Sequence, residues 1–250
     1  MSAPTRPEDL PLLRALNAGE YDFVDFGCSH GGSVEFAQQK FEGGAGLGMD
    51  IDPDKVMAAR EAGRDAMVVD LTQFAARADT ARFVLMSHLL EHLSGLKAAE
   101  QVMTCGVRIA RDFVFVQQPW FDSDGYLFGR GLKLFWSDWH GHPTRMTTLD
   151  FHYILKPLAD RGEIRDFSVY GSSPIRTSRH SAVHALGSPR NQKSHDPSAH
   201  PAKPDFPVLF RQPVFHEIHV VIDIDGRKGL DAYEASGLGG KRLYRYGKDG

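Results

Sequence analysis

Cysteine is scarce in this sequence. It has only 2 cysteines in 250 residues, and Cys28 and Cys105 form neither a metal-binding pattern nor a disulfide pattern. No apolar run reaches the length of a membrane span, and the N-terminal stretch lacks the basic-then-apolar order of a signal peptide. Internal repeats and heptads are also absent. These absences predict a protein of the reducing cytoplasm with no membrane partner.

The sequence also lacks a large excess of charge of either sign. With 29 Lys and Arg against 32 Asp and Glu, the formal net charge is −3, which argues against a general polyanion binder such as a nucleic-acid protein. Hydrophobic residues make up 42% of the chain, enough for one sizeable core. We therefore expect a single domain over 1–250. Composition gives no indication of the oligomeric state.

Strands and helices alternate through the first half of the chain. Apolar, β-branched and aromatic runs predict strands over 22–26, 45–51, 66–70, 82–87 and 112–119, with helices over 33–41, 53–62 and 89–109 between them. Asp52 before Pro53 is a typical helix start, and Gly63 is a typical helix end. This alternation predicts an α/β fold with a parallel sheet covered on both faces.

The pattern changes after residue 119. A helix is expected from Thr147 or Thr148, and two late strands are expected over 163–171 and 214–225. Because no helix separates them, they predict an antiparallel pair at the sheet edge, interrupted by a long insertion over 171–213. The whole prediction is a doubly wound, mostly parallel, seven-stranded sheet. No function is predicted for the polar tail over 227–250.

The stretch YDFVDFGCSHGGSVEFA (21–37) predicts a strand, a glycine turn and a helix start, where backbone N–H groups can approach a ligand. It lacks the G-x-G-x-x-G pattern of dinucleotide folds, and Asp25 would repel a pyrophosphate. A carboxylate here suits an amino group. Asp50, at the next strand end, suits ribose hydroxyls, and Asp70 suits the exocyclic amine of an adenine. An amine, a ribose and an adenine without phosphate indicate S-adenosylmethionine (SAM).

Four motifs in order then resemble class I SAM-dependent methyltransferases: FVDFGCSHGGS, GLGMDIDPDKV, AMVVDL and FVLMSHLLEHL. The segment FVLMSHLLEHL is similar to the small-molecule branch with a Glu-His pair after the fourth strand, including ubiquinone-pathway O-methyltransferases. The resemblance covers about 20–120, which it assigns as the cofactor-binding half of a Rossmann-like methyltransferase fold. It continues more weakly through HGHPTRMTTLDFHYIL.

The resemblance also implies which residues contact SAM. The residues it assigns are Gly27, Ser29 and Gly31 beside the methionine part, Asp25 near its amino group, Asp50 at the ribose, Asp70 and Leu71 at the adenine, Ser87 and His88 beside the sulfonium, and Ile51, next to Asp50, as a further cofactor contact. Ser29 stands where the family has a glycine, and it is small enough to fit the turn.

Histidines supply the candidate catalytic groups. On a helix, His88, Glu91 and His92 would share one face, with His92 as the first choice of general base. The same three residues could instead hold a divalent metal, or Glu91 and His92 could only buttress the cofactor loop. His140 and His142 are alternative bases.

The acceptor is expected to contact the segments 120–170 and 171–213. Trp120, Trp136 and Asp138 are candidate substrate-binding residues, with a loop anchored by its tryptophans as the alternative. The segment 171–213 carries six basic and two acidic residues. It could fold as a lid over an anionic acceptor through Arg176 and Arg179, or remain a solvated loop.

These patterns predict an enzyme that uses SAM to methylate a small molecule or glycan, at oxygen, with a divalent metal as an open question. Two alternatives stay open: a nucleic-acid methyltransferase, and a protein that binds SAM without catalysis.

Overall fold

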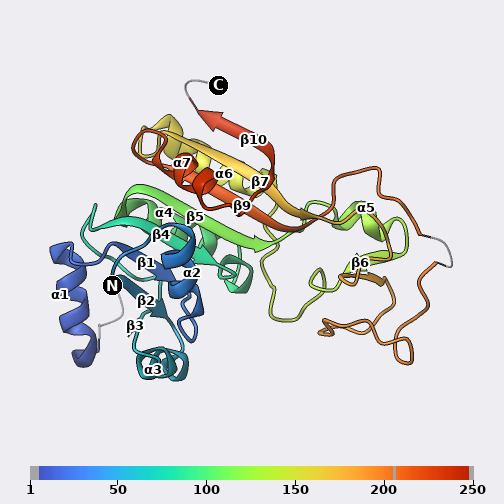
Figure 1. Cartoon of the computed structure of the whole chain (residues 1–250), viewed down its shortest axis with the longest axis horizontal. Helices are drawn as coiled ribbons and strands as arrows, with labels where there is room; N and C mark the ends of the chain where they lie inside the picture. The colour runs from blue at the N-terminus through green and yellow to red at the C-terminus, as the bar shows by residue number, and fades with distance from the viewer. Residues whose placement is uncertain (1–5, 205–206, 248–250) are drawn as a thin grey trace.

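A computed structural model describes residues 6–204 and 207–247. Its centre is a twisted sheet of eight strands (Figure 1). In spatial order the strands are β3 (Asp65–Val68), β2 (Gly46–Asp50), β1 (Phe23–Phe26), β4 (Ala81–Ser87), β5 (Ala110–Pro119), β9 (Phe215–Asp223), β7 (Asp166–Pro174) and β10 (Lys241–Gly247). The first five are parallel, whereas β9, β7 and β10 pair antiparallel with their neighbours. The prediction of a mostly parallel α/β sheet with an antiparallel edge is confirmed.

Helices cover both faces of this sheet. On one face, α2 (Gly32–Lys40), α3 (Pro53–Glu61) and α7 (Lys228–Ala235) pack against a buried phenylalanine cluster that includes Phe83 and Phe113. On the other face, α1 (Leu10–Ala18), α4 (Leu96–Ile109) and α6 (Thr148–Asp160) contribute to a second apolar cluster that includes Val84, Met86 and Val114. A 3-10 turn, η1 (Pro7–Asp9), precedes α1. The two apolar faces explain why the strands are almost continuously apolar.

The predicted helix starts are confirmed at two sites. The Asp52 carboxylate accepts hydrogen bonds from the backbone N–H groups of Asp54 and Lys55 at the start of α3. Thr147 and Asp150 form a reciprocal capping box at the start of α6. The helix continues three residues beyond Pro157, to Asp160.

The prediction of one helix over 89–109 is wrong at its beginning. Only a 3-10 turn, η2 (Leu90–His92), follows β4, and α4 begins at Leu96. The chain breaks because His88 and Gly95 both have positive φ angles, 53° and 152°. His88, Glu91 and His92 therefore do not share one α-helical face.

The prediction of seven strands is also wrong, because the tail adds an eighth. Residues 227–250 were expected to be a polar tail, but within them α7 packs on the sheet and β10 extends its edge beside β7. Tyr244 and Tyr246 pack against Phe167 on β7. Arg245 forms an ion pair with Asp166 at 2.6 Å. Residues 248–250 of the tail lie outside the described residues.

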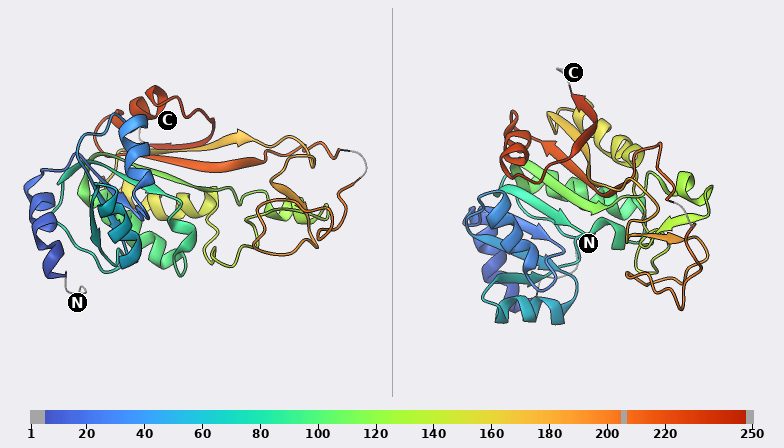
Figure 2. Two further views of the ribbon diagram at one scale, coloured as in Figure 1. Left: turned by 60° about the horizontal axis from the view of Figure 1, so that its bottom comes forward. Right: turned by 45° about the vertical axis from the view of Figure 1, so that its right-hand side comes forward.

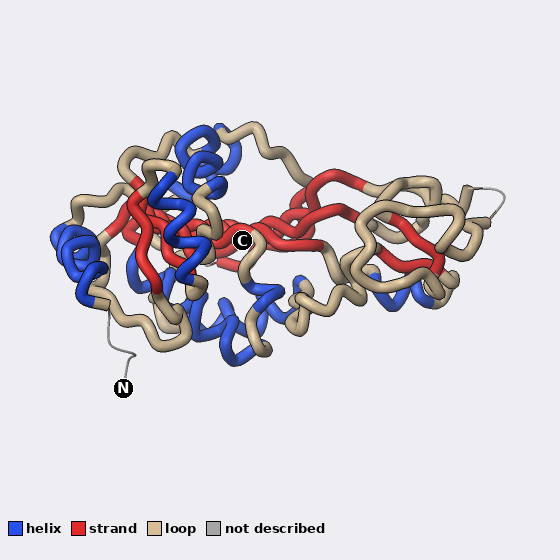
Figure 3. Tube along the Cα trace, turned by 90° about the horizontal axis from the view of Figure 1, so that it is seen from below, coloured by secondary structure: helices blue, strands red, loops and turns tan. Residues whose placement is uncertain are grey.

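The segments after β5 and β7 come together as a second part of the molecule, which we call the loop lobe (120–146, 175–204 and 207–213). Figures 2 and 3 show it beside the sheet, connected through the long strands β7 and β9. It contains a short helix, α5 (Asp124–Phe128), and a two-stranded sheet of β6 (Leu132–Leu134) and β8 (Val183–Ala185). The insertion over 171–213 is thus paired with the segment after β5.

Within residues 6–204 and 207–247, no helix is both long and apolar enough to cross a membrane.

Candidate active site

A glycine turn connects β1 to α2 at the carboxyl edge of the sheet. Gly27 and Gly31 adopt positive φ angles of 75° and 88°, and Ser29 adopts 48°. A side chain at Gly27 would meet Leu89, since a Cβ atom at this position would lie 2.9 Å from the Leu89 Cδ1 atom. The Ser29 N–H donates to the Asp50 carboxylate at 2.9 Å, which fastens the turn to the end of β2.

Asp25 lies on β1, two residues before Gly27, and is fully buried. Its Oδ2 atom accepts a hydrogen bond from Ser33 Oγ at 2.5 Å, whereas no group in the described part of the chain donates to its Oδ1 atom. Burial raises the pKa of Asp25 to about 7, and the Ser33 hydrogen bond only partly opposes this. A cationic group beside the turn would stabilise the carboxylate.

The ends of β2 and β3 present two more carboxylates. Asp50 accepts from the backbone of Ser29 and Asp52 through different oxygen atoms, and each oxygen keeps a second lone pair for a hydroxyl. Asp70 accepts from the Thr72 backbone and hydroxyl through one oxygen. Ile51, directly after Asp50, has a side chain that is 67% exposed.

His88, directly after β4, lies between two carboxylates. Its Nδ1 atom is 3.3 Å from Glu91 Oε1, and its Nε2 atom is 3.4 Å from Glu217 Oε1. Burial acts to lower the pKa of His88, but hydrogen bonds to Glu217 and Glu91 outweigh it and raise the pKa to about 9. The ring is therefore protonated at neutral pH and is a donor rather than a base.

Glu217 extends this arrangement into the antiparallel strand β9. Its second oxygen lies 3.4 Å from His219 Nε2, and His219 Nδ1 lies 2.9 Å from the Tyr233 hydroxyl on α7. Burial opposes ionisation of Glu217, but hydrogen bonds from His219 and His88 hold its pKa well below its usual range. A polar chain thus runs from α7 to the end of β4.

A second cluster faces the loop lobe. One donor atom from each of Glu91, His92 and His142 lies within 4.8 Å of the others. The rings of His92 and His142 meet edge to face, with centroids 5.1 Å apart. Burial lowers the pKa of His142, which keeps this ring neutral at pH 7. The cluster joins η2 to the loop before α6.

No family model and no curated protein matches the sequence. Solved structures, however, are similar to this chain in fold. A SAM-dependent methyltransferase from Archaeoglobus fulgidus is similar with a TM-score of 0.54 and 14% identity, over 86% of this chain and 93% of that one. A SAM-dependent methyltransferase from Thermotoga maritima is similar with a TM-score of 0.50 and 10% identity, over 87% and 94%. The chain has the fold of SAM-dependent methyltransferases.

The methyltransferase fold brings the predicted cofactor residues to one edge of the sheet. These residues are Asp25, Gly27, Ser29, Gly31, Asp50, Ile51, Asp70, Leu71, Ser87 and His88. They lie at or shortly after the carboxyl ends of β1, β2, β3 and β4, which meet at the same edge because these strands are parallel.

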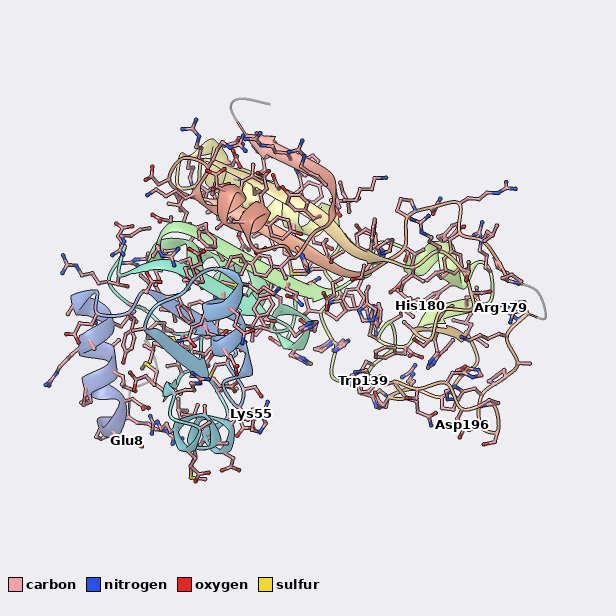
Figure 4. The ribbon with its side chains drawn as sticks, in the orientation of Figure 1. Glu8, Lys55, Trp139, Arg179, His180 and Asp196 are labelled. Carbon is pink, nitrogen blue, oxygen red and sulfur yellow. The ribbon has the colours of Figure 1, made fainter. Side chains whose placement is uncertain are left out.

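Trp120 and Trp136, the predicted substrate-binding aromatics, are buried in the structure. Trp120 and Trp136 are 3% and 2% exposed, and the Trp136 indole N–H donates to the Trp120 carbonyl at 2.8 Å, so both build the core of the loop lobe. Asp138 pairs with the buried Lys133 at 2.7 Å. Trp139, another aromatic of the same segment, is half-buried beside His142 on the side of the lobe that faces the sheet body (Figure 4).

The predicted basic lid is not assembled over the sheet edge. Arg179 lies on the outer side of the loop lobe in Figure 4, far from the glycine turn. Arg176 lines a groove along β7 together with Arg211 and Lys241. His140, one of the alternative bases, contacts Asn191 and Arg190 within the lobe.

Three histidines of the insertion pack against one another inside the lobe. The ring centroids of His184, His195 and His200 lie 4.9–5.7 Å apart. They therefore face each other rather than an acceptor.

Sequence reasoning missed Glu217, His219 and Tyr233. Glu217 and His219 alternate along β9 in the segment FHEIHV, so they point to the same face of a strand. Two ionisable residues on one face of an otherwise apolar strand are the sequence feature that could have indicated a functional role. Their link to His88 depends on the pairing of β9 with β5, which places His219 opposite Gln117.

Proposed function

We propose that the protein is a SAM-dependent methyltransferase that acts on a small-molecule or glycan acceptor at oxygen. The observation that carries the proposal is the buried Asp25 oxygen without a described partner, beside a glycine turn fastened to Asp50. Asp25 would pair with the SAM ammonium group, and Asp50 with the ribose hydroxyls. Ile51, Asp70 and Leu71 would hold the adenine, with the exposed Ile51 side chain against its face.

The reaction then takes place between the end of β4 and the loop lobe. An acceptor oxygen forms a bond to the methyl carbon while the carbon–sulfur bond breaks, and its electron pair stays on sulfur to give S-adenosylhomocysteine (SAH). The hydroxyl proton must leave the acceptor. Because the sulfonium is already activated, alignment of the reacting atoms supplies much of the rate.

The residues that activate the acceptor are proposed to be His92 and His142. Each ring has its Nδ1 atom beside a backbone carbonyl, at 2.6 Å and 3.2 Å, so the Nε2 lone pair of a neutral ring remains available. Such a lone pair can accept a proton or bind a metal. We assign His88, which lies between two carboxylates, a role in positioning the site. We assign His140 a structural role within the loop lobe.

Two alternatives make different predictions. A nucleic-acid methyltransferase would bind polyanions in a salt-dependent manner, which the net charge of −3 does not favour. A protein that binds SAM without catalysis would release no SAH with any acceptor. Oxygen is preferred over nitrogen because histidines with free lone pairs face the site, and a hydroxyl gains most from such groups.

Calorimetric titration with SAM and SAH, with NAD as the control ligand, tests cofactor binding. We expect micromolar binding of SAM and SAH and none of NAD. Asp50→Ala should weaken SAM binding by at least about tenfold, or about 1.4 kcal/mol. Asp54→Asn is the matched control, because it removes an acidic charge from the start of α3 and should leave the affinity unchanged. Absence of SAM and SAH binding would overturn the proposal.

A further inference from the structure

Three metal-ligating side chains converge at the acceptor side of the site. Glu91 and His92 come from η2, and His142 comes from the loop before α6. One donor atom from each lies within 4.8 Å of the others. The expected set of His88, Glu91 and His92 is not formed, because His88 is engaged by Glu217 on the other side.

The two imidazoles are oriented as metal ligands commonly are. Nδ1 of His92 lies 2.6 Å from the Gly141 carbonyl oxygen, and Nδ1 of His142 lies 3.2 Å from the Trp136 carbonyl oxygen. A carbonyl oxygen only accepts hydrogen bonds, so each neutral ring carries its proton on Nδ1 and leaves the Nε2 lone pair free. Ligating histidines in proteins are typically held by such a bond from the other ring nitrogen.

One carboxylate oxygen of Glu91 has no hydrogen-bond partner among the described residues. Its side chain is 1% exposed, and its Oε1 atom is close to His88. No described group donates to its buried Oε2 atom. A buried carboxylate oxygen without a partner is costly, and a bound cation is one of the few ways to satisfy it.

The ligands are also held in place by groups outside the cluster. The Thr144 backbone N–H donates to the Glu91 carbonyl at 3.3 Å, and the Thr144 hydroxyl donates to the Leu93 carbonyl at 2.7 Å. These bonds fix the loop that carries His142 against η2. The site therefore does not depend on the metal to bring its two segments together.

We propose that Glu91, His92 and His142 bind one zinc-like divalent cation beside the methyl-transfer site. This inference rests on the proposed function for its role, but not for the binding itself. Two imidazoles and one carboxylate favour zinc over magnesium, and three protein ligands leave a coordination position open. A cation there would supply Lewis-acid contact with an acceptor oxygen and lower the pKa of its hydroxyl.

The test is zinc binding to the full chain after treatment with a chelator and dialysis. We expect titration with zinc chloride to show one tight site, and elemental analysis to find one zinc per chain after dialysis. His92→Gln should weaken zinc binding by at least about 100-fold, since loss of a ligand costs more than loss of its supporting bond. His92 is exposed, so this variant should fold. His140→Gln, two residues before His142, is the matched control and should bind zinc like the wild type.

Two results would overturn the metal site: no zinc binding by the wild type, or the same affinity in His92→Gln. SAM titration of the same samples separates this failure from failure of the proposed function. SAM binding without zinc binding would leave His92 as a metal-free base, whereas zinc binding without SAM binding would retain the metal site and reject the methyltransferase.

Discussion

His92 Nδ1 lies 2.6 Å from the carbonyl oxygen of Gly141, a residue 49 positions further along the chain. This contact, together with the Thr144 bonds to Glu91 and Leu93, connects the turn after β4 to the loop lobe. The carboxyl edge of the sheet and the loop lobe therefore meet at the Glu91–His92–His142 cluster. An acceptor held there would be reached by groups from both parts of the molecule.

Affinity for SAM should depend on pH through Asp25. The pKa of about 7 in the folded protein lies above the ordinary value of 3.8, so the free protein holds this proton below pH 7. Pairing with the SAM ammonium requires the carboxylate, so binding at pH 6 must first remove the Asp25 proton, whereas at pH 8 the carboxyl group is already mostly ionised. Calorimetry should show SAM binding about tenfold weaker at pH 6 than at pH 8. Asp25→Asn should bind weakly at both values, and equal wild-type affinities would contradict the pairing.

Glu217→Gln should destabilise the fold. The substitution removes the negative charge that His88 and His219 share, and it leaves buried polar groups with poorer partners. We expect the free energy of unfolding at pH 7 to fall by about 1–3 kcal/mol. Urea unfolding measures this, with the exposed Glu234→Gln on α7 as the control. A loss no larger than that of the control would show that the polar chain contributes little.

Gly48→Ala should disturb the glycine turn, because Gly48 on β2 lies against Cys28 in that turn. A Cβ atom at Gly48 would lie 2.7 Å from the Cys28 sulfur and 2.9 Å from its Cβ atom. Because both groups are buried, we expect a loss of about 1–3 kcal/mol in the free energy of unfolding and weaker SAM binding. Gly125→Ala in α5 is the control, since nothing lies within 4 Å of a Cβ atom there. Unchanged SAM affinity in Gly48→Ala would mean that the turn adapts.

Asp138→Asn should loosen the loop lobe while leaving the sheet intact. Lys133 is 1% exposed and depends on Asp138 and the Ser188 carbonyl for its partners. Leaving this ammonium without its carboxylate costs about 3–5 kcal/mol. Limited proteolysis with mass spectrometry should show faster cleavage within 120–146, 175–204 and 207–213. The double variant Lys133→Met/Asp138→Asn should restore resistance, and failure of Asp138→Asn to increase cleavage would contradict the role of the pair.

Much of the fold could be predicted from the sequence because its signals are local. Apolar strands such as Phe23–Phe26 and Ala81–Ser87 alternate with capped helices, and Asp52 and Thr147 mark helix starts through bonds to residues two or three positions away. The grouping of the predicted cofactor residues at one sheet edge could also be predicted, because parallel strands place their carboxyl ends together.

The remainder depends on contacts between distant segments. Leu89, Leu90 and Leu93 have helical spacing, but the positive φ angles of His88 and Gly95 interrupt the helix. The strand β10 has a polar sequence because it lies at the edge of the sheet, where none of its residues is fully buried. His142 joins Glu91 only because the lobe folds back on η2, and no sequence spacing encodes that contact.

The most direct test of the account is a crystal structure of the protein with SAH. We predict that its amino group lies beside Asp25, its ribose beside Asp50 and its adenine between Ile51 and Asp70, with the sulfur directed toward Glu91, His92 and His142. SAH bound away from the glycine turn, or a sulfur atom directed away from the loop lobe, would contradict the assignment of this edge as the methyl-transfer site.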